Sequence, residues 1–218
     1  MTKNHVLDVH DIHSSSSIES LNLIVLGTYA KDWCDDALRQ ALVSSKASDG
    51  AEAVARKRRE IVFAVCAAES YLYEWVRDEV LKNKKDKIEQ LHRYFPPDMR
   101  KGIRCRWKTI LKGLATDQKI EAAPSFGGQN FHQFTVLVGY RNSFVHAGVS
   151  RPEQAGQKRE SAPEPSHKEL AELPHGWAIG AVLGIIRELH EAVGTEPPEW
   201  VKEASQKLDA RASARNAK

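Results

Sequence analysis

Apolar residues in this chain recur at the spacing of an α-helix, and no stretch shows the alternation of apolar and polar residues that is typical of a β-strand. A period near 3.6 residues places apolar side chains on one face of a helix, whereas a half-buried strand requires a period of 2. With 218 residues, of which 41% are hydrophobic, the chain has enough apolar side chains for one core. The pattern therefore predicts an all-α protein, a helical bundle of about five core helices plus a C-terminal tail helix.

Differences in composition along the chain predict three segments. We expect a flexible polar leader over residues 1–17 and a helical domain over residues 18–194. A mobile loop is expected within that domain at residues 148–173, because this stretch is rich in Pro, Glu, Ser and Lys and lacks an apolar period. Residues 195–218 are expected to form a charged tail helix that frays after Asp209.

Turn residues and prolines divide the helical pattern into separate helices. The polar turn at residues 44–50 ends the first helix, and Pro96 and Pro97 separate two short ones. The predicted helices run from after Ser17 to about Leu42, from about Asp49 to about Lys82, and over residues 87–94, 98–115, 130–147 and 177–193.

Charge and cysteine content restrict the possible classes of protein. The formal net charge of +3 does not by itself indicate a nucleic-acid partner. Cys34, Cys66 and Cys105 are odd in number and form no Cys-x-x-Cys pair, which favours a reducing compartment over a disulfide framework. The most apolar run, residues 177–186, is too short to span a bilayer. We therefore expect a cytoplasmic protein with no membrane partner.

The segment from Tyr140 to His146 contains the residue types of a phosphodiester-cleaving site. Arg141 can hold a phosphate through two hydrogen bonds, and His146 can transfer protons near neutral pH, so the chemistry requires no metal and no cofactor. Asn142 lies four residues before His146 and hence on the same helical face. The spacing alone is weak evidence, because an arginine and a histidine at this distance also occur together by chance.

Two charged residues occupy positions where the helical period calls for apolar ones. Glu69 interrupts the apolar stripe of the helix predicted over residues 49–82, and Arg141 interrupts that of the helix predicted over residues 130–147. Burying either charge alone costs several kcal/mol, so the simplest prediction is that the two side chains pair. Such a pair can also be purely structural, and the residues themselves leave this alternative open.

The motif and its setting resemble those of a HEPN domain. The signature of that family is Arg-x4-6-His with a polar residue after the arginine, near the end of a late helix that one more core helix follows. Arg141, Asn142 and His146 match this signature. Glu69 resembles the acidic or polar position that the family has on a preceding long helix. The resemblance covers roughly residues 18–193 and implies a HEPN-like helical bundle.

This resemblance implies a metal-independent endoribonuclease that acts as a homodimer, with two motif helices facing each other across a shared cleft. His146 would be the general acid or base for attack of the ribose 2′-hydroxyl on the adjacent phosphate. Arg141 would stabilise the charge that develops on the phosphoryl oxygens, Asn142 would orient the phosphate or the imidazole, and Glu69 would hold Arg141. The products would be a 2′,3′-cyclic phosphate and a 5′-hydroxyl.

The resemblance also implies a biological setting. Many HEPN domains serve toxin–antitoxin or antiviral defence systems, so an antitoxin or a sensor protein is an expected partner beside RNA. Two alternatives remain open. The chain could be a non-catalytic HEPN-fold module that binds RNA or a protein, or a helical scaffold or antitoxin-like partner in which Arg141 and Glu69 form a core ion pair.

Two basic runs could contact an RNA backbone. The first run, residues 100–108, contains lysines and arginines together with Trp107, as surfaces that bind single-stranded RNA do. A solvated helix face explains this run equally well. The second, residues 56–59, is expected to form a solvated first turn of a helix. The candidate RNA-binding residues of the first run are Arg100, Lys101, Arg104, Arg106 and Lys108.

Overall fold

The computed structural model describes residues 29–43, 50–82, 84–96, 102–146 and 165–216. Within these ranges every regular element is helical, so the all-α prediction is confirmed. No helix in these ranges is long and apolar enough to cross a membrane. The elements are α2 (Ala30–Leu42), α3 (Gly50–Trp75), the π-helical turn η2 (Val76–Val80), α4 (Lys87–Tyr94), α5 (Ile103–Thr116), α6 (Gln129–His146), α7 (His167–Glu172), α8 (Trp177–Ala192) and α9 (Glu199–Asn216).

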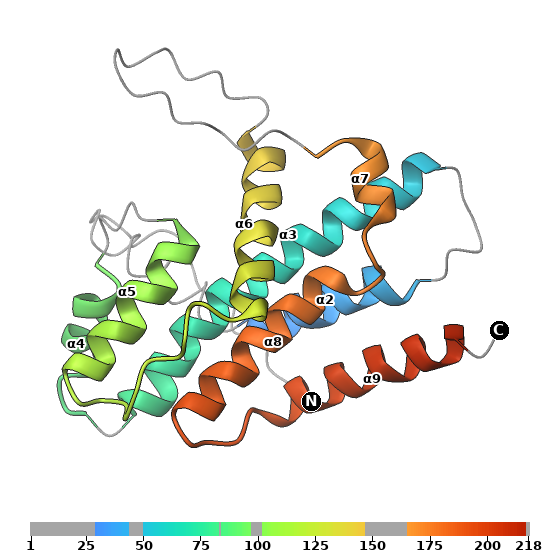
Figure 1. Cartoon of the computed structure of the whole chain (residues 1–218). Helices are drawn as coiled ribbons and strands as arrows, with labels where there is room; N and C mark the ends of the chain where they lie inside the picture. Colours follow the sequence, from blue (N-terminus) through green and yellow to red (C-terminus); the bar gives the residue numbers. More distant parts are fainter. Residues whose placement is uncertain (1–28, 44–49, 83, 97–101, 147–164, 217–218) are drawn as a thin grey trace, which may run out of the picture.

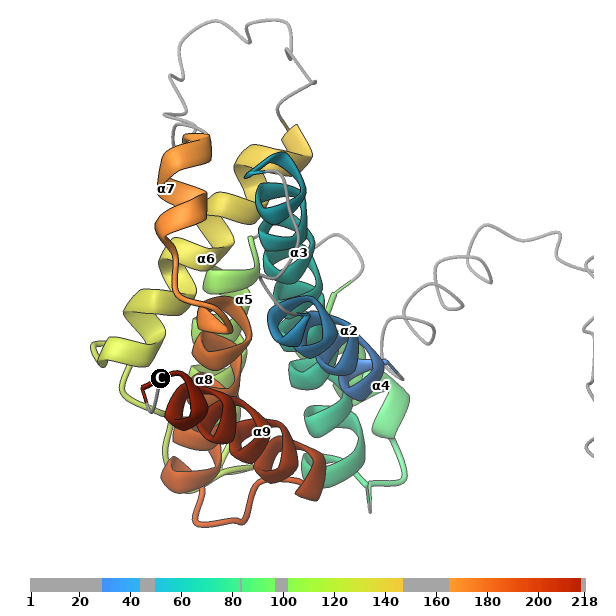
Figure 2. The same cartoon turned by 90° about the vertical axis from the view of Figure 1, so that its right-hand side faces the viewer.

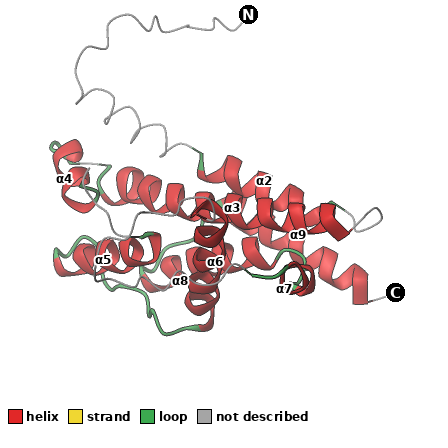
Figure 3. Ribbon diagram, turned by 90° about the horizontal axis from the view of Figure 1, so that it is seen from above, coloured by secondary structure: helices red, strands yellow, loops and turns green. Residues whose placement is uncertain are grey.

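The long helix α3 is the central element of the bundle. It packs against α2, α6, α7 and α8, and α6 lies across it while also packing against α8 (Figure 1). Helices α4 and α5 lie at one end of the molecule, and α7 and the end of α9 lie at the other (Figures 1 and 3). Helix α9 covers α2 and α8 (Figure 2). The C-terminal end of α6, which carries the motif, thus lies over the first half of α3.

Most predicted helix boundaries agree with the structure. The bounds of α4 are those predicted. Helix α6 differs from the prediction by one residue at each end, α8 differs by one residue at its C-terminal end, and α3 continues through η2 to within two residues of the predicted end. Helix α5 begins at Ile103, later than predicted. The predicted leader over residues 1–17, the first part of the predicted first helix and the predicted turn at residues 44–49 lie outside the described residues.

One prediction about the second half of the chain is wrong over part of its length. The predicted loop over residues 148–173 contains α7, because Ser166 and Glu169 form a reciprocal capping box and Leu170 is fully buried. Residues 147–164 of that loop lie outside the described residues. The tail helix is α9, which extends past Asp209 to Asn216, and its fraying stays a prediction. Leu208 of this helix lies beside Gly176 in the turn before α8.

A lysine and a glutamate are buried where α3 meets the start of α8. Lys57 Nζ donates hydrogen bonds to Glu60 Oε2 and to the carbonyl oxygen of Pro174, each at 2.9 Å. Glu60 Oε1 accepts a hydrogen bond from the backbone nitrogen of Ala178 at 3.1 Å, in the first turn of α8. Burial raises the pKa of the Glu60 carboxyl, and the nearby Lys57 opposes this effect. The pair therefore fixes the beginning of α8 on α3.

We predict that Lys57→Met lowers the free energy of unfolding by about 3–5 kcal/mol, because it leaves a buried carboxylate without its counter-ion. A carboxyl group with a raised pKa in the folded state binds more protons folded than unfolded, so the loss should grow as the pH rises from 5 to 7. Urea denaturation at both pH values measures it. Arg56→Met is the matched control, since Arg56 pairs with Glu52 at the surface, and should cost under about 1 kcal/mol. Equal losses for the two variants would contradict the assignment.

A glycine allows α6 and α8 to approach closely. A Cβ atom on Gly184 of α8 would lie 2.7 Å from Cγ of Asn130 of α6, whose amide donates to Glu188 Oε1 at 2.8 Å. The sequence predicts this role for both Gly180 and Gly184, which are four residues apart. The prediction is confirmed for Gly184 and wrong for Gly180, where a Cβ atom meets nothing within 4 Å.

We expect opposite effects from alanine at these two positions. Gly184→Ala should destabilise the protein by about 1–3 kcal/mol, because Asn130 must move and its bond to Glu188 is lost. Gly180→Ala should be neutral or stabilising by up to about 1 kcal/mol, since alanine favours the helix and has space. Thermal unfolding followed by circular dichroism distinguishes them, and a loss of similar size in both would show that the close approach is not specific to Gly184.

Candidate functional site

Apolar packing on α6 positions the motif residues. The predicted stripe is confirmed over its first part, and Arg141 lies one turn beyond it, half-buried where the stripe leaves the core. Tyr140 packs its ring against that of Trp177, the first residue of α8, with ring centres 6.0 Å apart. The motif segment is thus held against the start of α8. The period predicts a stripe of Phe131, Phe134, Val138 and Val145. The first three are buried, as is Leu137 beside them, and the side chain of Val145 lies outside the described residues.

The guanidinium group of Arg141 is held in place but its charge is not neutralised. Arg141 Nη1 donates to Asn142 Oδ1 at 3.1 Å, so the two motif residues are joined by a hydrogen bond to a neutral amide. Arg141 Nε is buried without a hydrogen-bond partner among the described residues. No carboxylate in that part of the chain forms an ion pair with Arg141. A half-buried cation in this state has strong potential to bind an anion.

The predicted pairing of Glu69 with Arg141 is wrong. Glu69 Oε1 instead accepts a hydrogen bond from Arg106 Nη1 of α5 at 2.6 Å, and the two side chains are 31% and 33% exposed. Glu69 is therefore at the edge of the core, and the fully buried carboxylate of α3 is Glu60. The helical period gives the direction of a side chain around its own helix, but it does not say which neighbouring helix lies there.

Cys66 shows that Arg141 nevertheless faces the same stretch of α3 as Glu69. Burial raises the pKa of the Cys66 thiol, the charge of Arg141 lowers it, and the charge of Glu69 raises it. Both charged groups therefore lie close enough to Cys66 to act on it. Glu69 is bound to Arg106 and not to Arg141, so it does not hold Arg141 in position.

His146 is the last residue of α6, and its side chain lies outside the described residues. Its place on one helical face with Asn142 follows from their spacing of four residues. Whether it reaches the guanidinium of Arg141 or a second copy of the chain remains a prediction.

Arg58 of α3 is a neighbour of the motif that the sequence did not indicate. Its guanidinium carbon lies 5.4 Å from the ring centre of Phe144, three residues after Arg141. The basic run at residues 56–59 was a possible signal, but we expected it to be a solvated first turn. That prediction is wrong for Lys57, which is buried, and for Arg58, which packs on α6. Arg58 of α3 thus lies against the C-terminal end of α6.

Three of the five candidate RNA-binding residues lie in the described ranges, all on α5. Arg100 and Lys101 lie outside these ranges, and Arg104 is exposed on α5. Arg106 bonds to Glu69 as described above, and Lys108 Nζ lies 5.1 Å from the ring centre of Phe131, half-buried. Of the three described members, Arg104 is the one whose side chain is fully presented to solvent.

A buried histidine forms a second polar cluster. His190 of α8 is 4% exposed, and its Nε2 and Nδ1 atoms are hydrogen-bonded to the hydroxyl groups of Tyr71 and Thr195. Burial lowers the pKa of His190 and raises that of Tyr71. Because the ring is enclosed, a substrate cannot contact it, and the cluster instead ties α8 to α3.

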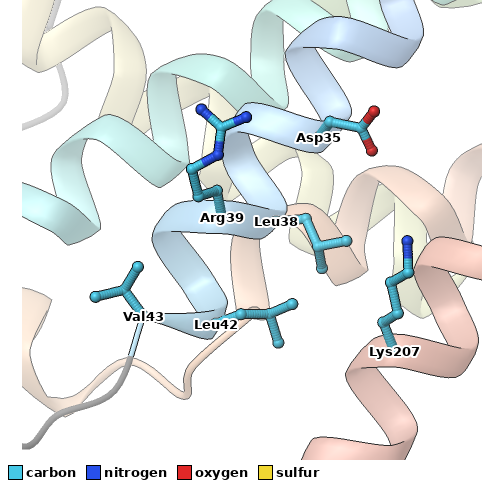
Figure 4. A pocket seen from close by; sticks show the side chains of 6 residues that line it. All are labelled: Asp35, Leu38, Arg39, Leu42, Val43 and Lys207. Carbon is cyan, nitrogen blue, oxygen red and sulfur yellow. The ribbon is translucent and has the colours of Figure 1, made fainter.

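Two pockets lie away from the motif. One, of about 440 Å³, is lined by α2 and Lys207 of α9, with Leu38 and Leu42 between charged side chains (Figure 4). The other, of about 540 Å³, lies between α9 and the turn before α8. Neither includes a motif residue. Within the described ranges, no three His, Cys, Asp or Glu side chains gather closely enough to hold a metal ion.

Comparisons with known proteins identify no relative of this chain. No protein-family model matches the chain, and searches of curated proteins and of solved structures find no match either. The likeness to a HEPN domain therefore depends on the motif, its helix and the all-α fold.

Double-mutant cycles test the observed pairing of Glu69. Glu69→Gln and Arg106→Gln should each lower the free energy of unfolding by under about 1 kcal/mol, because the pair is one-third exposed, and their effects should not add. The effects of Glu69→Gln and Arg141→Gln should add within about 0.5 kcal/mol. Urea denaturation of the single and double variants gives both cycles. Strong coupling of Glu69 to Arg141 instead of Arg106 would restore the pairing predicted from the sequence.

Proposed function

We propose that this chain is a metal-independent endoribonuclease of the HEPN type, with Arg141, Asn142 and His146 at its active site. The observation that carries the proposal is the state of Arg141. Its guanidinium is held by a neutral amide, has a buried Nε–H without a partner, and has no carboxylate partner in the described ranges. A phosphodiester would supply the missing negative charge and accept two parallel hydrogen bonds.

The reaction follows from the residue types. His146 accepts the proton of a ribose 2′-hydroxyl as its oxygen attacks the adjacent phosphorus. The bond from phosphorus to the 5′-oxygen breaks, and that oxygen leaves with a proton, giving a 2′,3′-cyclic phosphate and a 5′-hydroxyl end. Arg141 stabilises the charge on the non-bridging oxygens, and Asn142 keeps the guanidinium oriented. DNA lacks the attacking hydroxyl and is not cut.

Glu69 has a different role in this proposal from the one that the family resemblance implies. It holds Arg106 and lies near Arg141 without touching it. Arg58 is well placed to add positive charge beside the motif, because it packs on Phe144. Among the candidate residues of α5, exposed Arg104 is the best placed to contact a phosphate of bound RNA.

Binding of RNA without cleavage is the second candidate function. The same uncompensated Arg141 favours it, because holding a phosphate does not require His146. The scaffold alternative assumed a core ion pair between Arg141 and Glu69, and the described part of the chain contains no such pair. The homodimer, the antitoxin or sensor partner and the role in antiviral defence follow from the family resemblance alone, whereas the cytoplasmic location is proposed from the cysteine content.

Incubation with total cellular RNA in EDTA tests the proposal. We expect the wild-type protein to cut RNA and leave 2′,3′-cyclic phosphates, and we expect His146→Ala and Arg141→Gln each to lower the rate by about 100-fold or more. His132→Ala is the matched control, since His132 is exposed on the same helix outside the motif, and should keep full activity. Circular dichroism verifies that every variant is folded.

Three results would contradict ribonuclease activity at this site. Cleavage by His146→Ala at the wild-type rate would place the activity elsewhere or in a contaminant. A requirement for a metal ion would exclude the mechanism. RNA binding that depends on Arg141, without cleavage by the folded wild-type protein, would establish the second candidate function.

A further inference from the structure

The pocket between α9 and the turn that precedes α8 has room for a small ligand. Its volume of about 540 Å³ lies within the range of small-molecule sites in proteins. Its walls combine apolar side chains, such as Leu173, Pro174 and Leu208, with the polar groups of Glu172, His175 and Arg211. It shares no residue with the proposed ribonuclease site.

Two separate contacts fix the shape of this pocket. The carbonyl oxygen of Pro174 accepts the hydrogen bond from buried Lys57, which attaches the turn to α3. Gly176, with a φ of +74°, lies so close to α9 that a Cβ atom there would be 2.7 Å from Cδ2 of Leu208. The wall formed by the turn and the wall formed by α9 are therefore held together, and the pocket exists before any ligand binds.

Arg211 is the group in this pocket that requires an explanation. It is half-buried, and its Nε atom is buried without a hydrogen-bond partner. No described residue forms an ion pair or a hydrogen bond with it, whereas half-buried Arg56, Arg77 and Arg106 each bind a carboxylate. An arginine against apolar walls is stabilised by an anion that accepts its hydrogen bonds.

We propose that this pocket binds a small carboxylate with an apolar body. The carboxylate would pair with the guanidinium of Arg211, and the apolar body would lie against Leu173, Pro174 and Leu208. The charge of Glu172 at the pocket favours a singly charged ligand over doubly charged phosphate, because a second negative charge on the ligand increases the repulsion.

Ligand titrations followed by two-dimensional NMR of the full chain test this site. The probes are hexanoate, its neutral analogue hexanamide, and inorganic phosphate. We expect saturable binding of hexanoate with shifts at Leu208, Arg211 and Ala212, and binding of hexanamide and phosphate at least about tenfold weaker.

Three variants test separately the guanidinium of Arg211, the space inside the pocket, and the positive charge of α9 outside the pocket. Arg211→Gln should weaken hexanoate binding at least about tenfold. Ala212→Phe fills the pocket from an exposed helical position and should block binding while Arg211 remains. Lys207→Gln removes the same charge one turn earlier on α9, where the side chain lines the other pocket, and should leave binding unchanged (Figure 4).

Several outcomes would overturn the proposal. These are no saturable binding of hexanoate by the folded wild-type protein, equal binding of hexanoate and hexanamide, or equal weakening by Arg211→Gln and Lys207→Gln. Tighter binding of phosphate than of hexanoate would also overturn it, since the ligand would then be an oxyanion without an apolar body. None of these results depends on ribonuclease activity, so the two proposals can fail separately.

Discussion

The buried pair of Lys57 and Glu60 determines how the rest of the bundle is placed. Glu60 accepts a backbone N–H from the first turn of α8, and Lys57 binds the carbonyl oxygen of Pro174 just before that helix. Because α6 packs closely on α8 at Gly184 and again where Tyr140 meets Trp177, the position of the motif helix depends on where α8 begins. Loss of one partner would leave a buried charge without a counter-ion, which would strongly destabilise the fold.

Among the described residues, some buried or half-buried cations have a carboxylate partner and others do not, and we interpret this difference as one between structural and functional roles. Lys57, Arg56 and Arg106 each form an ion pair with a carboxylate of the chain, so their charges are neutralised within the fold. Arg141 and Arg211 are half-buried but have no carboxylate partner among the described residues. One belongs to the motif that resembles a HEPN site, and the other lines a separate pocket. We interpret both as sites for anions that the chain itself does not supply, a phosphodiester for Arg141 and a carboxylate for Arg211.

Much of the local structure was predictable because it depends on neighbours along the chain. The apolar stripe of α6 and the extent of α4 follow from the helical period. The half-buried position of Arg141 does not, because the period places this residue among the apolar ones. The candidate site was predictable as a set of residues on one helix. Its partners were not, because Glu69 binds Arg106 from α5, and Arg58 reaches Phe144 from α3. Contacts of this kind join residues far apart in sequence.

The sequence by itself determined that the protein is all-α, where most helices begin and end, and that Arg141 and Asn142 lie together on α6. These are consequences of side-chain period, prolines and turn residues, which act within a few positions. The tertiary structure alone decided which carboxylate is buried, which of Gly180 and Gly184 permits close packing, and that Arg141 and Arg211 have no carboxylate partner in the described ranges. The reason is physical, since the energy of a charge or a Cβ atom depends on the atoms that surround it in space, and only the packing of helices specifies these.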